Sequence, residues 1–100
     1  MIGMIKNLLG PKAGLRVVMR SDVPTRIALD LGTLVRSYGV MGWMQHVRQS
    51  HILIEVEGPK SKLDALIRRL QQTRFSDSPT VLEASWFPYT GHYIAFRVAL

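Results

Sequence analysis

The sequence predicts an α+β domain in which two helices cover one face of an antiparallel β-sheet. Apolar residues recur at helical spacing in two segments, 27–38 and 63–70. Strand-like segments occur at 15–20, 42–47, 51–57, 80–86 and 93–98. This order of elements is the ferredoxin-like split βαβ arrangement with an extra strand at the C-terminus. A length of 100 residues suits one such domain.

The first strand and the first helix each have a clear periodicity. In residues 15–20, apolar side chains alternate with others, as expected for a half-buried strand. Ser21–Thr25 then combines a capping side chain with a proline, which is typical of a helix start. The buried stripe of this helix is predicted to contain Ile27, Leu31, Leu34, Val35 and Tyr38. Gly39 follows in the position of a C-terminal cap.

The second half contains a predicted hairpin and the second helix. The strands at 42–47 and 51–57 form the hairpin, and Gly58-Pro59 ends it. Ser61–Asp64 resembles a capping box at the start of the next helix. The buried stripe of that helix is predicted to contain Leu63, Leu66, Ile67 and Leu70. The last two strands lie on either side of a predicted turn at 88–91.

The predicted topology makes the first and third strands central neighbours in the sheet. Arg16 and Arg20 are therefore expected to share the open face of the sheet with Glu55 and Glu57. Opposite charges on neighbouring strands contribute about 0.2–1 kcal/mol per pair. These two strands contain no aromatic residue, which argues against the base-stacking platform of single-stranded RNA-binding modules.

Composition limits the functions that the chain can have. The net charge is +6, and residues 1–50 contribute +5 of it through seven basic and two acidic residues. This favours an anionic partner without choosing among phosphates, nucleic acid and acidic membranes. The absence of cysteine excludes a disulfide framework, a thiolate metal site and a cysteine nucleophile. The three histidines lack metal-ligand spacing, so neither a metal nor a cofactor is predicted.

The first fourteen residues form a predicted appendage to a domain at 15–100. Met1, Met4, Ile5, Leu8 and Leu9 fall at helical spacing, and glycine and proline then break the pattern. This segment packs on the domain, lies on a membrane or partner, or frays. No apolar run reaches the roughly 18–20 residues that span a bilayer, and the start lacks the features of a secretory signal. The chain is therefore predicted to be cytoplasmic.

The landmarks of the chain resemble those of the acylphosphatase family. The matching residues are a helix-ending glycine, a Gly-Trp pair, a Glu-Gly-Pro turn and a final glycine–aromatic–aliphatic pattern: Gly39, Gly42-Trp43, Glu57-Gly58-Pro59, Gly91, Tyr93, Phe96 and Val98. Their spacing fits without insertion from Gly39 to Pro59, and the resemblance covers about residues 15–98. It implies hydrolysis of carboxyl-phosphate bonds. A glycine-rich loop cradles the phosphate, a helix-start arginine binds its oxygens, and an asparagine orients the attacking water.

The sequence departs from the family at each of these positions. Counting from Gly42-Trp43 places Ala28 at the arginine position and His46 at the asparagine position. The candidate anion-binding loop lacks glycine, and Pro24 removes a backbone donor from it. The loop consists of Ser21, Asp22, Val23, Pro24, Thr25 and Arg26. We therefore predict a retained fold that has lost efficient hydrolysis and serves as a binding or interaction module for a small anion or a protein.

An alternative interpretation keeps the enzyme active with Arg26 and His46 as its catalytic residues. Arg26 would replace the missing arginine, although it lies two positions before Ala28, about 200° round the helix. It could equally pair with Asp30 at i+4. His46 would orient or deprotonate water, or it is a solvated residue near a strand end. A domain contacting nucleic acid or acidic lipid through its basic residues is a third interpretation.

Overall fold

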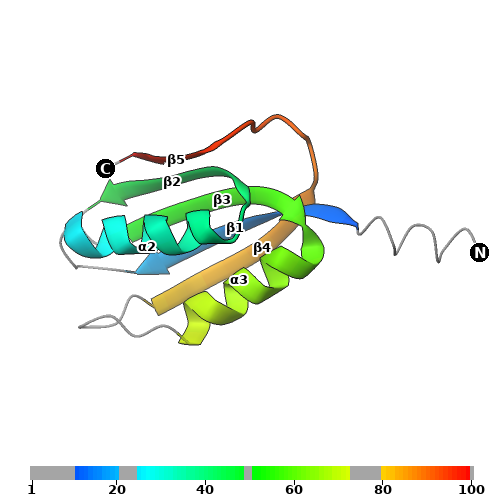
Figure 1. Cartoon of the computed structure of the whole chain (residues 1–100). Coiled ribbons are helices and arrows are strands. Elements are labelled where there is room, and N and C mark those ends of the chain that lie inside the picture. The colour runs from blue at the N-terminus through cyan, green and yellow to red at the C-terminus, as the bar shows by residue number, and fades with distance from the viewer. Residues whose placement is uncertain (1–10, 21–24, 49–50, 73–79, 100) are drawn as a thin grey trace, which may run out of the picture.

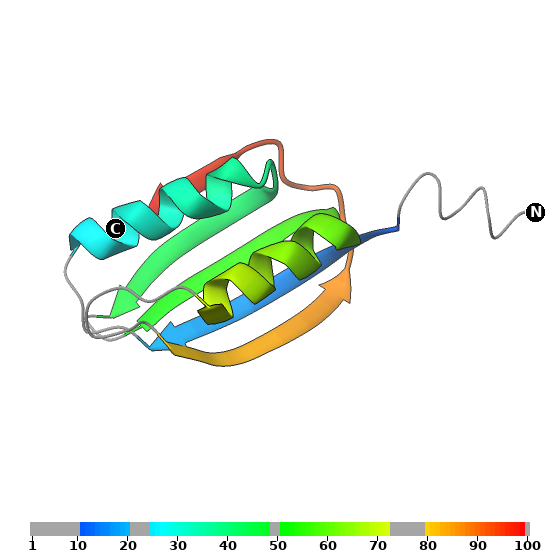
Figure 2. The ribbon, with the colours of Figure 1, turned by 60° about the horizontal axis from the view of Figure 1, so that its bottom comes forward.

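In the described part of the chain, two helices lie on one face of a five-stranded sheet, as Figures 1 and 2 show. The structure is a computed structural model that describes residues 11–20, 25–48, 51–72 and 80–99, with the backbone alone at 25–27, 47–48 and 80–82. The strands and helices are β1 (Lys12–Arg20), α2 (Thr25–Ser37), β2 (Met41–Arg48), β3 (His51–Pro59), α3 (Lys60–Gln72), β4 (Thr80–Pro88) and β5 (Phe96–Ala99). The predicted ferredoxin-like α+β class is confirmed.

The strand order across the sheet is β4-β1-β3-β2-β5. β1 is antiparallel to both β3 and β4, and β2 is antiparallel to β3. β5 pairs with β2 in parallel, so the sheet is mixed rather than wholly antiparallel. After β4, at one edge of the sheet, the chain crosses to the opposite edge (Figure 1). It arrives at the end of the sheet where β2 begins, so β5 runs in the same direction as β2.

Two predicted boundaries differ from the structure. β1 begins at Lys12, so the sheet includes part of the segment 1–14 that was predicted to be an appendage. Residues 1–10 lie outside the described part, and the appendage stays a prediction. β5 covers only Phe96–Ala99, because residues 89–95 form the crossing between the two sheet edges.

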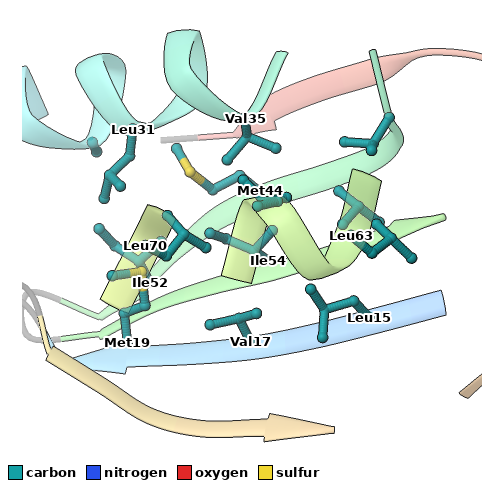
Figure 3. Packing of buried hydrophobic residues seen from close by; sticks show 14 residues of the cluster. Leu15, Val17, Met19, Leu31, Val35, Met44, Ile52, Ile54, Leu63 and Leu70 are labelled. Carbon is teal, nitrogen blue, oxygen red and sulfur yellow. The ribbon is translucent and has the colours of Figure 1, made fainter. Parts of the chain in front are cut away.

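The core lies between the sheet and the two helices (Figure 3). Fourteen hydrophobic residues are buried among the described positions, and they come from β1, α2, β2, β3, α3 and the residue before β2: Leu15, Val17, Met19, Ala28, Leu31, Val35, Val40, Met44, Ile52, Ile54, Val56, Leu63, Leu66 and Leu70. Leu34, Tyr38 and Ile67 pack against them at partial burial. The predicted helix stripes are confirmed, apart from Ile27, whose side chain is outside the description.

The glycine predicted to cap the first helix adopts the conformation that this role requires. Gly39 has a φ of +69°, in the left-handed region that favours glycine. Its N–H donates to the carbonyl of Arg36 at 3.0 Å, which satisfies one of the last carbonyls of α2. The chain can therefore turn directly from α2 into β2.

Candidate functional site

The elements of the predicted anion site meet at one end of the sheet. β1 ends at Arg20, α2 begins at Thr25 and β2 ends at Arg48, all at the same end in Figures 1 and 2. The loop residues Ser21, Asp22, Val23 and Pro24 lie outside the described part. Thr25 and Arg26 open α2, and their side chains are outside the description. The assignments of the loop and of Arg26 therefore stay predictions.

Ala28, at the position where the resemblance implies arginine, belongs to the hydrophobic core. Its residue exposure is 1%, so its methyl group contacts other core residues rather than water. A methyl group cannot donate to a phosphate oxygen. This position of α2 therefore contributes packing and supplies neither charge nor a hydrogen bond.

His46 lies close to the end of β2, on the helix-covered face. It pairs in register with Ile52, which is fully buried, and it is two residues from buried Met44 on the same strand. Its Nε2 is enclosed and has no hydrogen-bond partner in the part of the chain that the structure describes. An enclosed, unpaired polar atom costs about 1–3 kcal/mol and calls for an explanation, such as a ligand.

On the open face, Glu55 is the hub of a second polar cluster. Arg16 donates to its Oε1 from Nε at 2.9 Å and from Nη2 at 2.5 Å, and the Tyr93 hydroxyl donates to its Oε2 at 2.5 Å. Burial raises the pKa of Glu55, but the hydrogen bonds from Tyr93 and Arg16 outweigh it and lower the pKa overall. The predicted pairing of Arg16 with Glu55 is confirmed.

Glu57 lies on the open face, as predicted, and it accepts hydrogen bonds from the crossing segment. Its exposure is 2%, and its carboxylate accepts from the Thr90 N–H at 2.9 Å, the Thr90 hydroxyl at 2.7 Å and the Gly91 N–H at 3.0 Å. Burial raises the pKa of Glu57, but these donors outweigh it and lower the pKa. The carboxylate therefore fixes the crossing segment rather than an arginine.

A hollow of about 350 Å³ opens beside this cluster on the open face. Its lining includes Arg16, Glu55, Ser85, Phe87 and Tyr93. The hydrogen bond to Glu55 raises the pKa of Tyr93, with burial adding to the effect, so this phenol keeps its proton and is a poor acid. With both carboxylates already hydrogen-bonded, the arrangement suits binding better than proton transfer.

Apart from the Arg16–Glu55 contact, sequence reasoning missed this cluster, although Glu57, Gly91 and Tyr93 were among the family landmarks. Glu57 and Gly91 were noticed separately, and strand alternation placed Glu55 on the correct face. Nothing in local periodicity indicates that the crossing segment returns over that face, because the contacts join residues 33 to 38 positions apart.

Neither a cluster of metal-binding side chains nor a membrane-spanning helix occurs among the described residues. Among the described residues, no group of three or more histidine or acidic side chains could hold a metal ion. None of the described helices has the length and apolarity needed to cross a bilayer.

Comparison with known proteins identifies the fold. No protein-family model and no curated protein matches the sequence. An acylphosphatase from Coxiella burnetii superposes with a TM-score of 0.68 at 14% identity, over 88% of this chain and 93% of that one. An acylphosphatase from Bacillus subtilis superposes with a TM-score of 0.69 at 13% sequence identity, over 88% of this chain and 99% of that one. The chain has the acylphosphatase-like fold.

A larger protein contains a similar domain. Full-length HypF, in its phosphate- and nucleotide-bound form, superposes with a TM-score of 0.66 at 18% identity, over 87% of this chain. This chain spans only 12% of the length of that protein. The acylphosphatase-like fold thus occurs both as a small protein and within a larger one.

Proposed function

We propose that this acylphosphatase-like domain has lost efficient acyl-phosphate hydrolysis and acts as a binding module. The observation that carries the proposal is Ala28, since its buried methyl group stands where the family resemblance implies a phosphate-binding guanidinium. Electrostatic stabilisation by such preorganised donors is commonly the largest part of catalysis of this kind. The scaffold without that group favours ligand retention over turnover.

The ligand class we propose is a small phosphate-type anion at the end of the sheet that carries His46. The enclosed Nε2 of His46, which no described residue hydrogen-bonds, supports a site there, and the exposed Arg20 supplies positive charge at the same end. The start of α2 adds the partial positive charge of a helix N-terminus. HypF, which contains a similar domain, has been solved with phosphate and nucleotide bound.

An acetyl phosphate assay tests the loss of hydrolysis. The purified chain is expected to leave the spontaneous rate of acetyl phosphate disappearance unchanged, while inorganic phosphate produces a measurable heat of binding that His46→Ala weakens. Arg68→Ala, an exposed change on α3, is the matched control and leaves the binding heat unchanged. Turnover that both Arg26→Ala and His46→Ala abolish would instead establish the active enzyme.

Restoring the two family side chains is a complementary prediction. Ala28→Arg combined with His46→Asn is expected to produce acetyl phosphate turnover above the background rate, because it returns a guanidinium and a water-orienting amide. Circular dichroism checks that the variant folds, since Ala28 is buried. A folded double variant without turnover would mean that side-chain loss alone does not explain inactivity, and would place the block in the loop.

A further inference from the structure

The end of the sheet opposite the candidate anion site has an unusual surface. β1 and β2 begin there, and β3 and β4 end there, as the arrows in Figure 1 show. We call this surface the lysine–aromatic end and define it by its exposed residues: Lys12, Met41, Lys60, Lys62, Trp86, Tyr89 and Ile94.

Exposed apolar side chains concentrate at the lysine–aromatic end. Among the described residues, five large hydrophobic side chains are exposed, and four belong to it: Met41, Trp86, Tyr89 and Ile94. Met41 and Tyr89 line a hollow of about 380 Å³. Ile94, at 87% exposure, lies beside the start of β2, because the Gly42 N–H donates to the Ala95 carbonyl at 2.9 Å. Apolar groups gathered in this way mark contact surfaces rather than chance exposure.

Lysines surround these apolar side chains. Lys12 Nζ lies 5.1 Å from the centroid of the Tyr89 ring, and Lys60 Nζ lies 4.9 Å from that of Trp86. Lys62 Nζ lies 3.4 Å from where a Cβ on Gly39 would stand, which places it near the start of β2.

Among the described residues, nearby carboxylates offset only part of this lysine charge. Of the described carboxylates nearby, Asp64 pairs with Lys60 at 3.2 Å, and Glu57 is buried under its hydrogen bonds to the crossing segment. The lysine–aromatic end is therefore both apolar and cationic.

This combination fits an anionic lipid surface better than a nucleic acid. Trp and Tyr prefer the boundary between headgroups and hydrocarbon, and lysines attract acidic headgroups. A single-stranded nucleic acid would need open ring faces for stacking, and a lysine already covers one face of Trp86 and one of Tyr89. Met41 and Ile94 would gain nothing from a phosphate backbone, whereas hydrocarbon would accept them.

The sequence before β1 has the same character. Residues 1–9 contain Met1, Ile2, Met4, Ile5, Leu8 and Leu9, together with Lys6. The chain enters the described fold at this end, through Lys12.

We propose that the lysine–aromatic end docks peripherally on a bilayer that contains anionic lipid. The docked domain would present the start of α2 and His46 to water, on the opposite end of the sheet. This contact is independent of the proposed phosphate binding, because no residue is shared between the two surfaces.

Vesicle flotation of the full chain tests the proposal. The chain is expected to float with phosphatidylcholine vesicles that contain phosphatidylglycerol, to stay behind with pure phosphatidylcholine, and to be released by high salt. Changing Lys12, Lys60 and Lys62 together to Gln is expected to reduce binding on the order of 100-fold, which is about fivefold per lysine. Arg68 and Arg69 changed together to Gln remove two charges from the exposed side of α3 and are expected to change binding by less than about threefold.

The two tryptophans give a second readout. In Trp43→Phe, the remaining Trp86 is expected to shift its emission to shorter wavelength on anionic vesicles. In Trp86→Phe, Trp43 is expected to shift less than Trp86 does, because Trp43 is partly buried beside Glu55 and is not among the exposed residues of the lysine–aromatic end. Equal losses per charge from the lysine and arginine variants, an unmoved Trp86, displacement of vesicles by oligo(dT), or self-association without lipid would each overturn the proposal.

Discussion

At the residue scale, Glu55 and Glu57 hold the crossing segment from two adjacent positions on one face of β3. Glu55 receives the Tyr93 hydroxyl, and Glu57 receives Thr90 and Gly91. Hydrogen bonds to a carboxylate contribute about 1.5–3 kcal/mol, more than those between neutral groups. The segment between β4 and β5 is therefore attached to the sheet by charge-assisted bonds at several points.

Tyr93→Phe is expected to lower the free energy of unfolding by about 1–3 kcal/mol, because it removes the hydroxyl that Glu55 accepts. The variant is also expected to lose less stability at high pH than the unchanged chain does. The raised pKa of Tyr93 means that its contribution is complete below its ordinary value of 10.0 and is lost as the pH rises through the folded value. Urea titrations at neutral and alkaline pH measure both effects.

Tyr89→Phe is the matched control for this variant. The Tyr89 ring is exposed beneath Lys12, and the change keeps that ring. The expected change in unfolding free energy is within about 0.5 kcal/mol. Equal losses from the two variants would contradict a specific role of the Tyr93 hydroxyl.

Some of these side-chain contacts could be predicted from the sequence, and others could not. Alternation along β1 and β3 was enough to predict that Arg16 meets Glu55, because cross-strand partners follow from the topology. The same reasoning placed Glu57 on the open face, which is correct, but it could not identify the hydrogen-bond donors of Glu57. The donors of Glu57 come from a segment outside any strand, and periodicity cannot position such a segment.

At the element scale, Gly42 is where three strands converge. Its φ is +146°, its N–H donates to the Ala95 carbonyl before β5, and a Cβ there would lie 2.0 Å from the backbone oxygen of Glu55. Backbone atoms cannot yield as a flexible side chain can. The Gly-Trp pair that served as a family landmark thus has a physical reason in this chain, namely close approach of β2 to β3.

Gly42→Ala is expected to destabilise the domain by about 3–5 kcal/mol, because β2 and β3 must separate to admit the methyl group. Gly58→Ala is the control. A Cβ at Gly58 would meet Val40 Cγ1 at 3.5 Å, which is ordinary contact, and the expected change is below about 1 kcal/mol. Thermal unfolding of both variants checks the difference, and similar losses would refute the steric explanation.

The helices and the first three strands were predictable from sequence because each buries one periodic face. The strand that pairs with β5 was not predictable from the sequence. Its four residues alternate between partial burial and exposure, which identifies a strand without indicating its direction or neighbour. Parallel pairing with β2 follows only from the path of the crossing segment.

At the scale of the whole molecule, the two ends of the sheet have different chemistry. The end with His46 carries an enclosed nitrogen that has no hydrogen-bond partner among the described residues, while the other end carries lysines and exposed rings. Sequence analysis located the first end through the family spacing, since Ala28 and His46 are departures from a known pattern. It did not find the second, because that surface gathers residues from three strands, a helix and the crossing segment.

The stability of the whole fold is expected to fall in acid. Burial raises the pKa of Glu55 and of Glu57, but the hydrogen bonds to their carboxylates outweigh burial, so both pKa values are lowered in the folded chain. Their contribution to stability is complete above the ordinary pKa of 4.5 and is lost as the pH falls through the lower folded values.

Glu57→Gln is expected to lower the free energy of unfolding by about 2–3 kcal/mol at neutral pH, because the charge-assisted hydrogen bonds weaken. It is also expected to make the stability depend less on pH in acid. Asp64→Asn, in a half-exposed pair with Lys60, should cost at most about 0.5 kcal/mol. Urea unfolding at successive pH values measures these differences, and an acid limb as steep in Glu57→Gln as in the unchanged chain would show that Glu57 does not hold the crossing segment.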